Sequence, residues 1–99
     1  MRLNFVFLSD LSDVKFRKIR SSAECKSNDQ KLGPFKNVLK CADACKKKKG
    51  CRYFIYGQDG TRKATFCFWE KTSPKCPKGF EKDDYDFYEV AKGKESPWM

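Results

Sequence analysis

The sequence of 99 residues contains no histidine. Without an imidazole group, the Ser-His and Cys-His nucleophile pairs, a histidine general base and histidine-containing metal sites are all excluded. No Cys-x-x-Cys pair occurs either, which argues against dithiol redox chemistry and against a zinc site of the knuckle type. We therefore expect a protein that is not an enzyme and that has no metal ion or cofactor.

Long hydrophobic runs are also missing. The longest, Phe5-Val6-Phe7-Leu8, is far shorter than the ~20 apolar residues that a transmembrane helix needs. Polar residues flank this run and no small-residue cleavage site follows it, so it makes a poor signal peptide. The sequence thus predicts no transmembrane segment and shows no targeting signal.

Cysteine, in contrast, is abundant. Six cysteines, an even number, indicate a disulfide framework, and 15% aromatic residues supply the apolar side chains of one small domain. Disulfides persist in oxidising compartments. We therefore expect a secreted protein or one in an organelle lumen, and a mature or incomplete chain rather than a cytosolic protein.

The net charge of +9 is unevenly distributed. Residues 1–58 contain 14 Lys and Arg against 5 Asp and Glu, whereas residues 59–99 contain 8 of each. Such a charge attracts polyanions or acidic protein surfaces, although a solvated basic face is the plainer interpretation. The candidate basic set is Lys46, Lys47, Lys48, Lys49, Arg52, Arg62 and Lys63.

The chain divides into three zones: an arm or edge extension over residues 1–21, a cysteine-containing domain over 22–91 and a tail over 92–99. A helix is expected after Asn37, a good N-cap, because apolar residues follow with helical spacing at Val38, Cys41, Ala42 and Cys45. Lysines crowd the last turn, where the helix dipole favours cations, and Gly50 suits a left-handed cap.

Strands are expected over residues 51–56, 64–69 and 84–90, with a further partner strand near 22–26. The first two form a β-hairpin, because Asp59-Gly60 lies in the loop between them. Gly33-Pro34 is expected to break the chain before the helix. The predicted fold class is α+β, a small disulfide-rich antiparallel β-sheet with one helix packed across it.

The cysteine spacing in and after the helix is distinctive. Two cysteines at i and i+4 of one helix, Cys41 and Cys45, cannot easily bond each other, and Cys51 and Cys67 follow as partners from the sheet. This spacing resembles that of the PAN/Apple domain family, over about residues 22–91. Further matches are Phe54-x-Tyr56, Trp69 and an ending, Asp84 to Glu89, that is similar to protist-type variants.

Six cysteines alone permit 15 pairings, so spacing does not decide among them. The resemblance implies a nested arrangement of three bonds, namely Cys41–Cys67, Cys45–Cys51 and an outer bond Cys25–Cys76. Domains of this family bind proteins or glycans through variable surfaces, so the resemblance implies a binding function but no particular contact residue.

The faces of the predicted sheet suggest a second apolar surface. Cys67 must face the helix, so its neighbours Phe66 and Phe68 point to the opposite face. The family pattern places Tyr53 and Ile55 on that face too. The surface formed by Tyr53, Ile55, Phe66 and Phe68 needs a cover, either the arm 1–21 or another molecule.

Acidic residues gather near the last strand. Asp84 and Asp86 share one side of it, with Glu81, Asp83 and Glu89 nearby. Paired acids can serve glycosidase chemistry or bind calcium, but no calcium-loop spacing occurs here. Charge pairing with the basic half of the chain is the preferred interpretation.

Two functional hypotheses follow. The first is a non-enzymatic, disulfide-stabilised binding module that contacts a protein or a sulfated glycan; nucleic acid is disfavoured by the oxidising setting. The alternative is a structural accessory subunit, docked permanently on a larger assembly in an oxidising lumen, such as a photosynthetic or other membrane complex.

Overall fold

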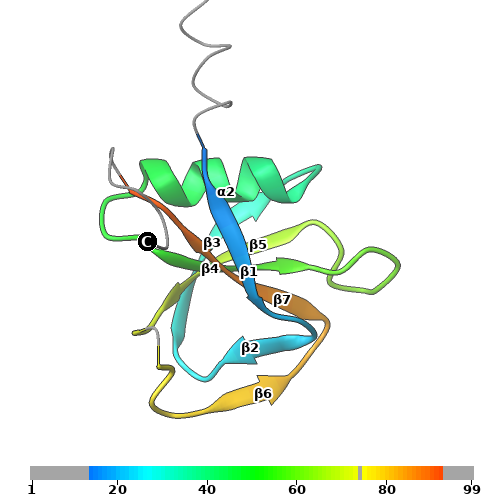
Figure 1. Cartoon of the computed structure of the whole chain (residues 1–99). Helices are drawn as coiled ribbons and strands as arrows, with labels where there is room; N and C mark the ends of the chain where they lie inside the picture. The colour runs from blue at the N-terminus through cyan, green and yellow to red at the C-terminus, as the bar shows by residue number, and fades with distance from the viewer. Residues whose placement is uncertain (1–13, 74, 93–99) are drawn as a thin grey trace, which may run out of the picture.

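The computed structural model describes residues 14–73 and 75–92, which form a helix and seven strands in three layers (Figure 1). Five strands make an antiparallel sheet in the order β1-β7-β4-β5-β3, and β2 pairs with β6 in a second, smaller sheet. The strands are β1 (Phe16–Arg20), β2 (Ala23–Cys25), β3 (Asn28–Pro34), β4 (Tyr53–Gly57), β5 (Phe66–Lys71), β6 (Phe80–Lys82) and β7 (Tyr85–Val90). The predicted fold class is confirmed.

The helix, α2 (Val38–Lys47), lies across one face of the large sheet (Figure 1). It begins as predicted, because the Asn37 side chain accepts a hydrogen bond from the backbone N–H of Lys40. It buries Cys41, Ala42 and Cys45. It ends before the predicted glycine: Lys48 is the C-cap, and Gly50 has its positive φ of 87° two residues further on.

Three disulfides connect these layers. They are Cys41–Cys67 and Cys45–Cys51 on the helix side, and Cys25–Cys76 on the opposite side of the sheet. This is the pairing that the PAN/Apple resemblance implied. None of the six cysteines is free, which is consistent with an oxidising compartment.

The face of the sheet opposite the helix is covered from within the chain, by a small second sheet in place of the arm or the partner molecule that we expected. The small β2–β6 sheet lies over it, and Phe80 stacks edge-on against Phe87 at 5.4 Å. Tyr53 and Ile55 are therefore only 6% and 1% exposed. Phe68 packs half-buried in the same cluster, and of the four predicted residues Phe66 alone is exposed, at 40%. Of the two strands that supply this cover, β2 lies where a strand was predicted, whereas β6, only three residues long, was not predicted.

Besides β6, which was not predicted, three strands differ from the prediction. The part of the arm from Phe16 onwards is an edge strand, β1, and Phe16 packs against Phe54 and Tyr88 on the helix side; residues 1–13 lie outside the described residues. The strand predicted near 22–26 pairs with β6 instead of joining the large sheet. The third, β3, was not predicted, because an edge strand tolerates the terminal Gly33-Pro34 that we expected to break the chain.

The predicted β4–β5 hairpin is present. The last residue of β4, Gly57, has to be a glycine because a Cβ atom at this position would clash with the backbone carbonyl of Lys63 across the turn. In the part of the chain that the structure describes, no helix is long and apolar enough to span a bilayer.

Candidate functional site

A cavity of about 630 Å³ opens beside the outer disulfide, between the β2–β3 turn and the segment that leads from β5 to β6. We call it the basic groove. It is lined by Lys26, Ser27, Asn28, Lys71, Thr72, Ser73, Pro77 and Lys78. These residues come from segments that are up to about fifty positions apart in the sequence, so only the folded chain brings them together.

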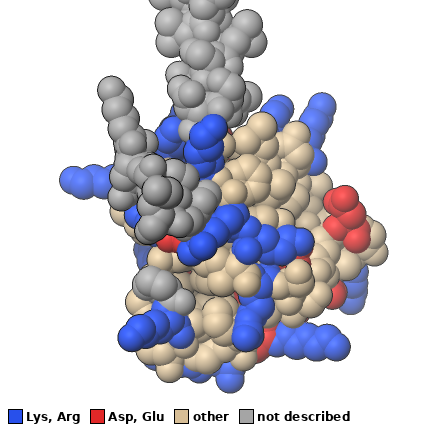
Figure 2. Space-filling model, viewed as in Figure 1, with Lys and Arg blue, Asp and Glu red and all other residues tan. Residues whose placement is uncertain are grey.

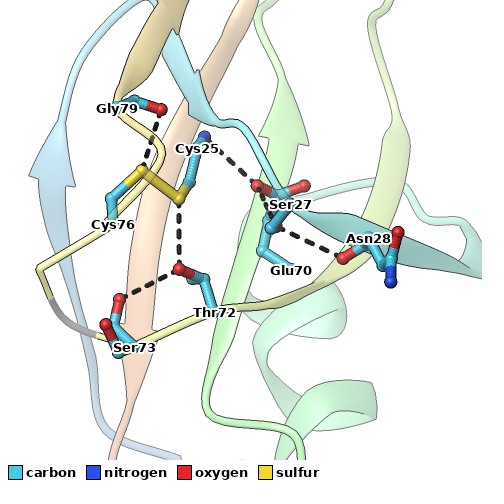
Figure 3. The surroundings of a disulfide bond; sticks show 8 residues. All are labelled: Cys25, Ser27, Asn28, Glu70, Thr72, Ser73, Cys76 and Gly79. Atoms are coloured by element: carbon cyan, nitrogen blue, oxygen red, sulfur yellow. Dashed lines mark hydrogen bonds between the residues drawn. A yellow bond between two sulfur atoms is a disulfide. The ribbon is translucent and has the colours of Figure 1, made fainter.

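The Cys25–Cys76 bond holds the walls of the groove in place (Figure 3). The Thr72 hydroxyl lies 3.1 Å from the Cys25 sulfur. The backbone N–H of Lys26 donates to the Gly79 carbonyl at 2.9 Å, which ties the β2–β3 turn to the segment before β6. The groove is thus a rigid feature, because a covalent bond and hydrogen bonds connect its opposite sides.

Positive charge dominates this groove. Lys26, Lys71 and Lys78 are exposed, and among the described residues none of them forms an ion pair with an acid. The Lys71 ammonium lies 4.7 Å from the centroid of the Trp69 ring, an aromatic platform that also fixes its position. The hydroxyls of Ser27, Thr72 and Ser73 also line it, and those of Ser27 and Thr72 already donate to the Glu70 carboxylate and to the Ser73 carbonyl. The three ammonium groups suit a multivalent anion.

A buried carboxylate supports one wall of the groove (Figure 3). Glu70 accepts hydrogen bonds at Oε1 from the backbone N–H of Cys25 (3.1 Å) and from the Ser27 hydroxyl (3.4 Å). Its burial, together with the nearby carboxylates of Glu24 and Asp29, raises the pKa of Glu70 to about 8. Glu70 thereby connects β5 to the end of β2 and to the turn that follows.

The predicted basic set does not form one patch. Strand β4 divides it into two groups, which lie at opposite ends of the strand (Figure 1). The group before β4 is Lys46, Lys47, Lys48, Lys49 and Arg52, and the group after it is Arg62 and Lys63. A strand of five residues spans about 16 Å. In Figure 2 the basic side chains are correspondingly spread over the visible face.

Several members of the predicted set already have partners. Lys47 pairs with Asp43 at 3.1 Å and Arg52 pairs with Glu89 at 3.0 Å. Lys63 lies over the Tyr85 ring, 5.2 Å from its centroid. These contacts favour the structural interpretation of this set over a shared anion site.

A lysine that we assigned to the tail caps the C-terminal end of α2 with hydrogen bonds from its side chain. The Lys92 ammonium donates to the carbonyl oxygens of Cys45, Lys46 and Lys48 at 3.1, 2.9 and 3.1 Å. Partial burial, and then the nearby charges of Arg52 and Lys46, lower the pKa of Lys92. The negative end of the helix dipole is therefore neutralised by a cation from outside the helix.

The predicted charge pairing of the acids near the last strand is confirmed for two of them. Glu89 is buried and its carboxylate pairs with Arg17 and Arg52, both at 3.0 Å. Asp86 pairs with Lys18 at 3.1 Å. Asp84 is exposed.

The basic groove was missed because two of its three lysines, Lys71 and Lys78, lie in the half of the sequence that has no net charge. The available signal was local: Lys-Ser, Lys-Thr and Pro-Lys steps flank the two outer cysteines in loops. The implied Cys25–Cys76 bond would have placed these steps side by side. Comparisons with family models, with curated proteins and with solved structures found no match for this chain.

Proposed function

We infer that this chain is a non-enzymatic, disulfide-stabilised binding module that recognises a sulfated glycan through the basic groove. One observation carries the proposal: three lysines without acidic partners among the described residues surround an open cavity of about 630 Å³ together with three hydroxyls. Sulfate esters on a sugar chain present repeated anionic groups with several acceptor oxygens, and lysine ammonium groups, each with a charge and three donors, complement both features.

The chain's hydrophobic surface supports a glycan over a tightly bound protein. Among the described residues, the large hydrophobic side chains that are exposed are Ile19 (38%) and Phe66 (40%). They belong to β1 and β5, which are separated by two strands of the sheet, so they do not form one patch. A permanent protein interface has an apolar core. The burial of Tyr53 and Ile55 therefore favours the glycan over a permanently docked protein partner.

The PAN/Apple relationship is part of the same proposal. Its support is the nested pairing of the cysteines, with two bonds between the helix side and the sheet and an outer bond across the opposite face. Glycan binding is one of the functions that this resemblance implies.

The test compares two variants that remove equal charge from different places. The groove variant removes the three positive charges of the basic groove and is Lys26→Gln/Lys71→Gln/Lys78→Gln. The matched control removes three charges at the end of the helix and is Lys47→Gln/Lys48→Gln/Lys49→Gln. Calorimetric titration with a heparin oligosaccharide should show affinity reduced about tenfold or more by the groove variant, since an exposed charged contact contributes up to about 1 kcal/mol. The control should lose less, and salt should weaken binding to the unsubstituted protein.

Two further ligands identify the chemistry. The same oligosaccharide after desulfation should bind weakly, and an acidic polypeptide of equal charge should bind less tightly than the sulfated chain. Equal losses in the two triple variants would mean that net charge alone attracts the ligand. If the acidic polypeptide binds as tightly as the sulfated chain, the ligand is an acidic protein surface and not a glycan.

A further inference from the structure

Three acidic side chains meet at the edge of the fold, where β2, β3 and β5 come together. A carboxylate oxygen from each of Glu24, Asp29 and Glu70 lies within 4.8 Å of the others. Asp29 is directly opposite Glu70 in the β3–β5 pair, and like charges in that relationship destabilise a sheet. A proton or a cation is needed here to offset the repulsion, and the raised pKa of Glu70 reflects the first of these.

The described residues do not supply a cation. Among the described residues none of the three acids has an ion pair with lysine or arginine. Burial, a hydrogen bond with Asp83 and the charges of Asp83, Glu81 and Asp29 raise the pKa of Glu24 to about 8, so its neighbours are also acids. On a chain of net charge +9, a cluster without a basic partner is an exception that calls for an explanation.

Glu70 provides a second and independent observation. Its side chain is only 1% exposed, and while Oε1 accepts the two hydrogen bonds already described, Oε2 is buried with no partner. A buried carboxylate oxygen left unpartnered costs free energy. The carboxyl group faces the other two acids, because its oxygen lies within the 4.8 Å group.

We propose that Glu24, Asp29 and Glu70 form a binding site for one divalent cation of the calcium type. Calcium binds oxygen ligands at about 2.3–2.6 Å, so two oxygens on opposite sides of the ion are up to about 5 Å apart, which matches the spacing of this cluster. Magnesium requires about 2.1 Å and a stricter octahedron. All three donors are carboxylates, which favours a hard cation over zinc or copper.

The surroundings permit binding. Asp29 is exposed and Glu24 is half-buried, so the ion reaches Glu70 from the solvent side and keeps water molecules as its remaining ligands. The bound ion gives Oε2 of Glu70 a partner and neutralises the Asp29–Glu70 pair. It also joins β2 to the β3–β5 edge. This site revises the expectation, drawn from the absence of histidine, that the chain has no metal ion.

The test uses the whole chain with its disulfides intact, freed of metal with EDTA and titrated with calcium chloride by calorimetry. We expect one ion per chain, with a Kd between about 10⁻⁶ and 10⁻³ M. Terbium, as a luminescent probe excited through tyrosine and tryptophan, should bind at the same site and be displaced by calcium.

Three variants assign the site. Glu70→Gln should abolish calcium binding and Asp29→Asn should weaken it about tenfold or more. Asp59→Asn, an exposed acid in the β4–β5 loop, is the matched control and should bind as the unsubstituted protein does. Calcium should raise the melting temperature of the unsubstituted protein and of the control, but not of Glu70→Gln.

Clear outcomes would overturn the proposal. These are no calcium binding at about 10 mM, ten times the weakest affinity expected of such sites, or equal affinities for Asp29→Asn and Asp59→Asn. A rise in stability of Asp29→Asn without any cation binding would show that the acids share a proton instead. Because Asp29 is exposed, its variant keeps the test valid even if Glu70→Gln fails to fold.

Discussion

The ammonium group of Lys92 lies 3.1 Å from the carbonyl oxygen of Cys45, at the end of α2. This contact joins the segment that follows the last strand, β7, to the helix that crosses the sheet. It shows that the end of the described chain is part of the packed fold, although its sequence is polar and resembles a tail.

We predict that Lys92→Met destabilises the protein by about 1–2 kcal/mol. The change removes three charge-assisted hydrogen bonds to helix carbonyls while it keeps most of the apolar stem. Urea denaturation with intact disulfides measures the change. Lys49→Met, at an exposed position in the same region, is the control, and equal effects of the two substitutions would contradict a capping role for Lys92.

Burial of the predicted apolar face leads to a second prediction. Ile55→Ala should destabilise the protein by about 2–5 kcal/mol, because it leaves a cavity between the two sheets. Ile19→Ala, at an exposed position, should change stability by about 0.5 kcal/mol or less. Thermal unfolding of the two variants distinguishes them. Similar small effects would mean that Ile55 is accessible and that the small sheet does not cover it.

The outer disulfide should contribute most to stability. The Cys25–Cys76 bond closes the longest loop, with a sequence separation of 51, against 6 for Cys45–Cys51. In the chain-entropy model, removal of these bonds costs about 4 and 2.5 kcal/mol, as upper estimates. Double Cys→Ala variants of each pair, compared by urea denaturation, should follow this order. The reverse order would show that local packing outweighs loop length.

Asp86 should make the fold sensitive to acid. Burial opposes ionisation of this carboxylate, but hydrogen bonds from the Ser22 N–H and the Gln58 amide, and then the Lys18 ammonium, outweigh it and lower the pKa of Asp86 below 3.8. The unfolded chain then binds a proton at a higher pH than the folded chain. The stabilisation is therefore complete above the unfolded pKa and is lost as pH falls through the folded value.

Measurement of the free energy of unfolding between pH 7 and pH 2 tests this prediction. Asp86→Asn should reduce stability at neutral pH and flatten the decline below about pH 4, the region of the ordinary aspartate pKa. An unchanged slope in the variant would assign the acid sensitivity to other carboxylates.

The helix and the hairpin were predictable because their signals are local. Asn37 is a local N-cap signal, and apolar residues recur with helical spacing at Val38, Cys41 and Cys45. Neighbouring residues alone therefore specify the helix. The β3 and β6 strands carried no such signal. Both are short or polar edge elements that form because a partner strand is already in place.

The sequence by itself determined an α+β domain with a cysteine-based framework, a positively charged surface and no imidazole chemistry. Composition and short-range spacing are enough for these properties. Only the tertiary structure decided that Tyr53 and Ile55 are core residues, that the predicted basic set is divided by β4, and that a basic groove and an acidic cluster lie beside the Cys25–Cys76 bond. Each of these depends on contacts between distant segments, and such contacts are fixed by chain topology and burial rather than by neighbouring residues.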